Sequence, residues 1–274
     1  KLNIIKQETI LNIYILLNIT ILKGENIMNN TIVAFIISSI AGLSTLIGAT
    51  LILIKKKNIN NFILKTMAFS AGVMFSLSVL DLLPESIKFL STNFYKFPSI
   101  IISLIFVSIG VLISIFIDKK VPTDNNNNLY KVGFVSMIAI IIHNIPEGIA
   151  TFITTKSDIT LGISLAIAIA LHNIPEGISI ALPIYYGTNK KKKAFFYTFI
   201  SGISEPFGAL LALLFLKPSN IVLGIIFGLI AGIMTHISCY ELMPSSLKYK
   251  NYQSSILYFI IGSIFVIINL ILFN

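Results

Sequence analysis

The motif His143-Asn144-Ile145-Pro146-Glu147-Gly148-Ile149 occurs a second time further along the chain, as His172-Asn173-Ile174-Pro175-Glu176-Gly177-Ile178. The two copies are identical at every position, and each lies in the middle of a long apolar run. An apolar run of about 20 residues is long enough to cross a bilayer as a helix. A charged side chain at the centre of such a helix costs about 3 kcal/mol. The repeated motif therefore predicts a polar site held between two neighbouring membrane helices.

The composition of the 274-residue chain is that of an integral membrane protein. Hydrophobic residues make up 55% and charged residues only 11% of the chain, whereas soluble domains carry about 25% charged residues. This excludes a soluble enzyme, a nucleic-acid-binding protein and a disordered chain. The single cysteine, Cys239, excludes a disulfide framework and a metal site built from several cysteines.

Eight apolar runs are long enough to span a membrane, so the predicted fold class is an all-α integral membrane protein with eight transmembrane helices. The predicted spans are Thr31–Ile54, Thr66–Pro84, Pro98–Ile117, Val132–Thr154, Ile159–Tyr186, Ala194–Leu216, Asn220–Met243 and Ser254–Phe273. The longest polar connection, Asp118–Lys131, contains four consecutive asparagines and is predicted to be a disordered loop.

Lysine placement predicts the orientation of the spans. The loops after spans 1, 3, 5 and 7 contain thirteen lysines, whereas those after spans 2, 4 and 6 contain four. The positive-inside rule therefore predicts a multi-pass protein of the cell (inner) membrane with both termini outside. Because the basic loops face an anionic leaflet, the net charge of +9 requires no nucleic-acid partner.

Residues 1–27 are predicted to be a translated leader or a non-native extension, and residues 28–274 a single transmembrane domain. The apolar run Ile10–Leu22 is too short to cross a bilayer. Lys-Gly-Glu at residues 23–25 can be encoded by a purine-rich ribosome-binding sequence, which makes Met28 the expected start. The alternative is a short interfacial helix, and N-terminal sequencing of natively expressed protein separates the two.

A second, weaker repeat aligns Ala71–Ser86 in span 2 with Ala231–Ser246 in span 7, with seven of the sixteen positions identical. The two spans run in opposite directions, so the repeat is inverted. It predicts a 3+2+3 arrangement in which spans 1–3 and spans 6–8 flank spans 4 and 5. Inverted repeats around a midplane site are typical of secondary transporters. Chance similarity between apolar helices rich in small residues is the alternative.

The ionisable residues inside the spans indicate a bound cation. All three histidines and five of the eleven acids lie in predicted spans, which contain no lysine to neutralise them. A histidine and a glutamate at positions i and i+4 share one helix face, so each motif offers two ligands. The proline interrupts the backbone hydrogen bonds, and the glycine is expected to let the two helix backbones approach closely. Protonated carboxylates and a proton relay are the alternatives.

These features resemble the ZIP (Zrt/Irt-like) family of divalent metal transporters, and within it the bacterial GufA-like branch. The resemblance rests on the twin HNIPEG motifs, on Ser204-Glu205-Pro206 in span 6 and on His236–Pro244 in span 7. It covers the chain from Met28 to the end. It implies transport of Zn²⁺, and also Fe²⁺, Mn²⁺ or Co²⁺, into the cytoplasm, with no enzymatic activity and no resident cofactor.

The resemblance also implies a midplane centre for two metal ions. One ion would be held by His143, Glu147, His172 and Glu176, with Met74 nearby, and the other by Asn144, Glu147, Asn173, Glu176 and Glu205. Imidazole and carboxylate ligands suit borderline divalent ions such as Zn²⁺. Packing is the alternative role for the methionine.

Four further residues are predicted to line the route to and from this centre. Asp81 and Glu85 would form an acidic outer mouth, and His236 and Glu241 would line the inner exit. Helix capping or local hydrogen bonding is the alternative for these acids. A metal-selective or proton-conducting channel, and an intramembrane metal-dependent hydrolase, are the alternative functions. The expected partners are divalent metal ions and the lipid bilayer, and the sequence leaves the oligomeric state open, with a homodimer as one option.

Overall fold

The computed structural model describes residues 30–54, 58–120, 128–214 and 219–273 of the chain. These residues form eight helices that are long and apolar enough to cross a membrane. The predicted fold class, all-α with eight transmembrane helices, is confirmed. The predicted leader, residues 1–27, lies outside the described residues, so that prediction is not tested.

The spans follow one another in the order predicted. The first, Asn30–Leu53, ends in α2 and a short 3-10 helix, and the second and seventh each contain a π-helical segment between two α-helices. The elements are α2 (Thr45–Ala49), η1 (Thr50–Leu53), α3 (Ile59–Leu77), η2 (Ser78–Leu82), α4 (Leu83–Ser91), α5 (Lys96–Lys120), α6 (Asn128–Ser157), α7 (Ile159–Thr188), α8 (Lys191–Leu214), α9 (Asn220–His236), η3 (Ile237–Leu242), α10 (Met243–Leu247) and α11 (Tyr252–Phe273).

Polar residues cap the first turns of two helices, and one of these helices begins well before its apolar run. Asn58 accepts a hydrogen bond from the backbone N–H of Asn61 at 3.0 Å, so α3 begins before the predicted start of span 2. Asp158 accepts from the N–H groups of Thr160 and Leu161 at 2.8 and 3.1 Å and caps α7. Each cap satisfies backbone donors that the first helical turn leaves free.

The connection predicted to be disordered, Asp118–Lys131, is shorter in the structure than expected. Helix α5 continues to Lys120 and α6 begins at Asn128, so only residues 121–127 lie outside the described part. The carboxylate of Asp118 lies 2.7 Å from Lys131 Nζ, and this ion pair joins the end of α5 to the start of α6. Asparagine-rich composition alone did not indicate that both ends of the loop are helical.

Helices α5 and α11 bury small and polar residues and expose apolar ones, which is the reverse of a helix in a soluble protein. In α5 the buried residues are Ser99, Ser103, Gly110 and Ser114, and in α11 they are Ser255, Gly262, Val266 and Asn269. The large apolar side chains of both helices are exposed on the opposite face. Small and polar residues at helix contacts, with apolar residues turned outward, are what packing in a bilayer favours.

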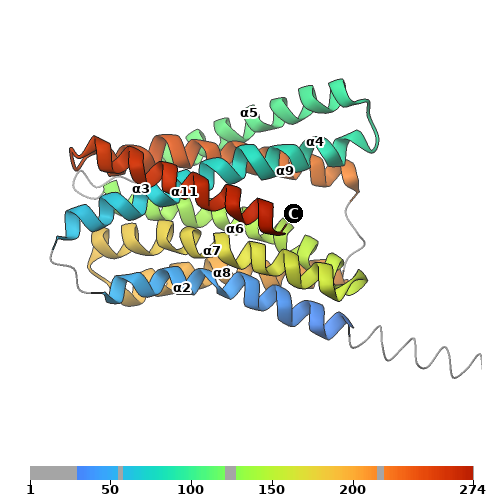
Figure 1. The fold of residues 1–274 in the computed structure, drawn as a ribbon, viewed down its shortest axis with the longest axis horizontal. Helices are drawn as coiled ribbons and strands as arrows, with labels where there is room; N and C mark the ends of the chain where they lie inside the picture. Colours follow the sequence, from blue (N-terminus) through green and yellow to red (C-terminus); the bar gives the residue numbers. More distant parts are fainter. Residues whose placement is uncertain (1–29, 55–57, 121–127, 215–218, 274) are drawn as a thin grey trace, which may run out of the picture.

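The helices form two groups (Figure 1). Helices α2 and α8 lie in one half of the bundle and α3, α4, α5, α9 and α11 in the other, while α6 and α7 contact helices of both halves. Packing crosses the predicted repeats, since α3 in span 2 packs along α11 in span 8, while α9 in span 7 packs along α5 in span 3. In the predicted repeat, span 2 is equivalent to span 7 and span 3 is equivalent to span 8. The two packed pairs are therefore equivalent to each other.

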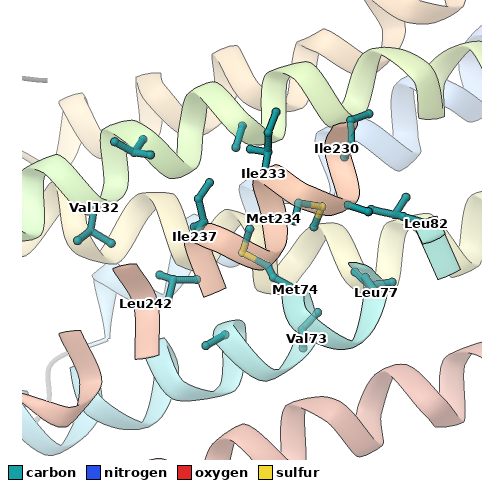
Figure 2. Close-up of a cluster of buried hydrophobic side chains, with 14 of the residues drawn as sticks. Val73, Met74, Leu77, Leu82, Val132, Ile230, Ile233, Met234, Ile237 and Leu242 are labelled. Atoms are coloured by element: carbon teal, nitrogen blue, oxygen red, sulfur yellow. The ribbon is translucent and has the colours of Figure 1, made fainter. Parts of the chain in front are cut away.

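A buried apolar cluster joins spans 2 and 7 where their π-helical segments begin. Met74 of α3 and Met234 of α9 lie near its centre and are both fully buried (Figure 2). The two methionines occupy equivalent positions of the second repeat. The π-helical segments η2 and η3 follow at matching positions and carry Asp81 and Glu241 respectively. Single π-turns within α-helices frequently occur at functional sites.

Hydrogen bonds between helices also recur at equivalent positions of this repeat. Ser86 Oγ donates to the carbonyl of Gly224 at 2.6 Å, and Ser246 Oγ donates to the carbonyl of Leu64 at 2.9 Å. The two donors align with each other in the second repeat, and so do the two acceptors when its alignment is continued without gaps. These matched contacts support the inverted 3+2+3 arrangement, which stays a prediction.

Candidate metal centre

The two motifs bring four ionisable side chains together between α6 and α7. His143 Nε2 lies 3.1 Å from Glu147 Oε1 on its own helix and 3.7 Å from Glu176 Oε1 on the neighbouring helix. His172 Nε2 lies 2.9 Å from the same Glu147 oxygen. All four residues are buried. The helices continue through Pro146 and Pro175, so the prolines do not end them.

The spacing of these atoms suits a metal ion. One ligand atom from each of His143, Glu147 and His172 can be chosen so that the three lie within 4.8 Å of one another. Tetrahedral Zn²⁺ with bonds of about 2.0–2.1 Å has ligand atoms about 3.3 Å apart. Glu147 Oε1 lies 2.9 and 3.1 Å from the two histidine nitrogens, slightly closer than that, and Glu176 Oε1 lies 3.7 Å from His143 Nε2, slightly further away. Small side-chain movements would therefore complete the coordination of a divalent ion.

The second predicted ligand set lies beside the first and includes α8. Asn173 Nδ2 donates to Glu205 Oε2 at 2.9 Å and to the carbonyl of Ala41 in the first span at 2.9 Å. Asn144 Nδ2 donates to the carbonyl of Ser201 at 3.1 Å. When the alignment of the second repeat is continued into spans 1 and 6, these two carbonyls fall at equivalent positions. The two asparagines are therefore oriented by corresponding backbone groups of opposite repeats.

Many buried oxygens at this centre have no hydrogen-bond donor among the described residues. They are Asn144 Oδ1, Asn173 Oδ1, Glu147 Oε2, Glu205 Oε1 and both carboxylate oxygens of Glu176. Buried polar atoms are nearly always satisfied, and an unsatisfied one costs about 1–3 kcal/mol. The amide donors face backbone carbonyls, which leaves the amide oxygens as acceptors. A set of free oxygens and imidazole nitrogens is the donor chemistry of a divalent cation site.

A cavity of about 580 Å³ connects the centre to one end of the bundle. Glu147 and His172 line its inner part, and the predicted outer-mouth residues Asp81 and Glu85 also line it. Glu85 pairs with Lys88, since Glu85 Oε1 lies 2.7 Å from Lys88 Nζ. Asp81 is near enough to interact electrostatically with His172 and Glu147. The structure thus places the predicted outer acids and the motif residues around one space.

The predicted inner-exit residues have other partners. His236 Nδ1 lies 2.9 Å from Ser114 Oγ, and its ring stacks on that of Tyr240 with centroids 5.1 Å apart. The side chain of Glu241 lies near that of Asp118, which pairs with Lys131. Both predicted residues therefore contact the end of α5, which brings this helix into the inner end of the bundle.

Met74 lies among apolar side chains, as Figure 2 shows, and is fully buried. Its closest described environment is the cluster that joins spans 2 and 7, which includes Val73, Leu77 and Met234. This environment explains its burial by packing alone. Its role as a metal ligand stays a prediction.

The motif glycines act differently from what the sequence suggested. They were expected to bring the two motif helices together. A Cβ atom at Gly148 would instead collide with the backbone carbonyl of Glu205 in α8, and one at Gly177 with the carbonyl of Thr45 in α2. Glycine therefore packs each motif helix against an outer helix, because only a residue without a side chain permits such an approach.

Sequence reasoning missed several residues that the structure brings to the centre or its mouths. Asp118 and Lys131 were assigned to a loop, and Asn269 was taken as part of an apolar helix, although it lines the cavity. The carbonyls of Ala41 and Ser201 carry no sequence signal of their own. Their equivalent positions could have indicated them, had the second repeat been extended into spans 1 and 6.

Comparison with known proteins gives one consistent result. The sequence model of the family described as "ZIP Zinc transporter" matches residues 123–269. A protein named zinc transporter ZupT from Streptococcus mutans is 39% identical over 256 residues, which cover 88% of this chain and 97% of that protein. Proteins of the same name from Clostridium perfringens and Oceanobacillus iheyensis are each 36% identical, over 92% and 89% of this chain and 100% and 99% of their own lengths.

Proposed function

The chain belongs to the ZIP family of zinc transporters and carries divalent metal ions across a membrane, and we propose that Zn²⁺ is its main cargo and moves inward through the buried histidine–glutamate centre. It is a multi-pass membrane transporter and not an enzyme. Fe²⁺, Mn²⁺ and Co²⁺ are the further ions that the ligand set accommodates, since imidazole and carboxylate bind all of them.

The observation that carries this proposal is the cluster of three buried carboxylates on α6, α7 and α8, which no lysine of the described residues pairs with. Glu147, Glu176 and Glu205 are all at most 7% exposed. The lysine ion pairs of the described residues involve Glu85 and Asp118, which lie away from this centre. Among the described residues, the groups that can carry positive charge beside these carboxylates are the two motif histidines, and burying carboxylates without enough positive charge is costly. A bound divalent cation supplies the missing positive charge, and its release at the inner end completes transport.

The route begins at the outer cavity. Asp81 and Glu85 line this cavity together with Lys88, which pairs with Glu85, so Asp81 is the acid left to attract a cation there. The ion then exchanges water for the nitrogen of His172 and the carboxylate of Glu147. The absence of thiolate ligands keeps the affinity low enough for release.

The motif residues hold two ions rather than one. His143, Glu147, His172 and Glu176 surround the first, and the asparagine oxygens together with Glu205 surround the second. Glu147 and Glu176 bridge the two ions. This is supported by their oxygens without a hydrogen-bond donor, namely the second oxygen of Glu147 and both oxygens of Glu176.

Release takes place at the opposite end, past His236 and Glu241. Lysine placement puts that end in the cytoplasm and both termini outside the cell membrane. The matched contacts of the two halves support alternating access, in which the halves exchange conformations around a fixed site. The ion pair of Asp118 with Lys131 then lies at the cytoplasmic end.

The test is uptake of radioactive zinc into proteoliposomes. Wild type is compared with His143→Ala and Glu176→Ala, with Mn²⁺ and Fe²⁺ as competitors. We expect saturable uptake by wild type and its loss in both variants at equal insertion. Uptake by either variant at the wild-type rate would refute the proposed centre, and single-channel conductance in wild type would refute a carrier mechanism.

A further inference from the structure

The first span supplies none of the predicted ligands, yet it lies against the metal centre. A Cβ atom built on Gly42 would lie 2.7 Å from Glu205 Cβ, 3.1 Å from Glu205 Oε2 and 2.5 Å from the carbonyl oxygen of Gly202. Real Cβ atoms do not approach other atoms below 3.0 Å. A side chain at residue 42 would therefore collide with Glu205 Cβ and the Gly202 carbonyl and press on the Glu205 carboxylate, so this glycine fixes where the Glu205 side chain can lie.

Ala41, the residue before Gly42, binds the asparagine that contacts Glu205. Asn173 Nδ2 donates both to the carbonyl of Ala41 and to Glu205 Oε2, each at 2.9 Å. Asn173 and Glu205 are both fully buried. Residues 41 and 42 thus hold the amide in place from one side and leave room for the carboxylate on the other. The remaining oxygens, Asn173 Oδ1 and Glu205 Oε1, have no donor among the described residues and are free for a metal ion.

The opposite repeat contains the same arrangement without the carboxylate. In the extended alignment of the second repeat, Gly202 is equivalent to Gly42, and Glu205 is equivalent to Thr45. A Cβ atom at Gly202 would meet Thr45 Oγ1 and would lie 2.8 Å from the carbonyl oxygen of Gly42. The Thr45 hydroxyl donates to that carbonyl at 2.7 Å. Both glycines permit the same close approach of the two helices, but only Gly42 faces a predicted metal ligand.

We propose that Gly42 is a positioning residue of the metal centre, whose missing side chain keeps the Glu205 carboxylate against Asn173 and in reach of the second metal ion. This inference rests on the proposed function, since it assumes that Glu205 binds metal. It assigns to the first span a part in metal binding that its own side chains do not reveal.

A double-mutant cycle on purified full-length protein tests this. Zinc affinity and stoichiometry are measured by competition with a chromophoric chelator for wild type, Gly42→Ala, Glu205→Ala and the double variant. We expect Gly42→Ala to weaken binding of one zinc ion by about 10–100-fold, the usual effect of disturbing a residue that orients a ligand. In the Glu205→Ala background it should cause no further loss of affinity, because the alanine keeps the Cβ that Gly42→Ala meets but has lost the carboxylate that would be displaced from the ion.

A purely structural role of Gly42 gives a different result. The collision with the Gly202 carbonyl persists in the Glu205→Ala background, so a packing effect would weaken binding by the same factor in both backgrounds. That outcome, or wild-type binding by Gly42→Ala, would overturn the proposal while leaving the metal centre intact. Wild-type binding by Glu205→Ala would instead overturn the assignment of Glu205 as a ligand, on which the proposal depends.

Gly202→Ala is the matched control. It narrows the same helix contact but displaces a threonine hydroxyl rather than a carboxylate, so we expect a comparable loss of thermal stability with zinc affinity within about 3-fold of wild type. A loss of affinity equal to that of Gly42→Ala would contradict the proposal. Should Gly42→Ala fail to fold, Glu205→Asp withdraws the carboxylate from Asn173 and Gly42. The proposal expects binding as weak as in Glu205→Ala, and wild-type binding would overturn it.

Discussion

Replacing Glu147 with glutamine removes the charge that joins the two histidines of the centre and leaves its shape unchanged. Glu147 Oε1 lies 3.1 Å from His143 Nε2 and 2.9 Å from His172 Nε2, and the residue is 7% exposed. Losing one partner of a buried, hydrogen-bonded charge pair at a binding site costs about 2–5 kcal/mol of binding free energy. At about 1.4 kcal/mol per factor of ten, we expect the zinc dissociation constant of Glu147→Gln to rise by about 30-fold to 4,000-fold.

The assay is chelator competition on the purified protein in lipid nanodiscs, with uptake of radioactive zinc as a second readout. Asp158→Asn is the matched control, because it also exchanges an acid for its amide. Asp158 caps α7 outside the centre, and asparagine caps a helix as well as aspartate does. Its zinc affinity should equal that of wild type. If Glu147→Gln is folded and binds zinc within about 3-fold of wild type, a difference of about 0.7 kcal/mol, the reasoning is refuted.

Three further outcomes are expected. Zinc uptake should fall as the outside pH is lowered from about 7.5 to about 5.5, because protons compete with the metal for imidazole and carboxylate; a steep rise would indicate proton-coupled symport instead. Ser86→Ala and Ser246→Ala should each destabilise the protein by about 0.6–1.7 kcal/mol in equilibrium unfolding, since each removes a matched hydrogen bond between helices. In a Cys239→Ser background, a cysteine at Lys191 should react with an impermeant maleimide only from the cytoplasmic side and one at Tyr95 only from outside, and the reverse pattern would contradict the orientation.

The number and order of the helices could be predicted because bilayer thickness fixes the length of an apolar run. Some helix ends could not. Asn58 extends α3 into polar sequence through a local hydrogen bond that hydropathy does not detect, whereas α7 begins at the predicted residue, Ile159. The ends of α5 and α6 were placed in a loop because asparagine-rich composition outweighed the pairing of Asp118 with Lys131.

Much of the centre was also predictable, because an exact repeat of histidine and glutamate at helical spacing has few explanations in a membrane. The motif residues His143, Glu147, His172 and Glu176 meet between α6 and α7, as the repeat suggested. Their roles as ligands stay predictions. The helix that packs against each motif glycine was not predicted, because a glycine indicates a close contact with another helix but not which helix makes it.

The contributions of the first span were invisible in the sequence for a related reason. The Ala41 carbonyl and the space at Gly42 belong to the backbone, so no residue type marks them as part of a metal site. They become recognisable only through the opposite repeat, where Ser201 and Gly202 occupy the equivalent positions. A weak internal repeat, once extended into its flanking spans, can therefore reveal backbone groups that residue types do not mark.

The central claim is that the paired motifs hold the transported ion, and anomalous diffraction at the zinc absorption edge tests it most directly. Crystals grown with Zn²⁺ should show an anomalous peak about 2.0–2.2 Å from His143 Nε2 and from the carboxylate of Glu147, the usual zinc–ligand distances. A zinc ion bound elsewhere, with the space between His143, Glu147 and His172 free of anomalous density at saturating zinc, would contradict the account.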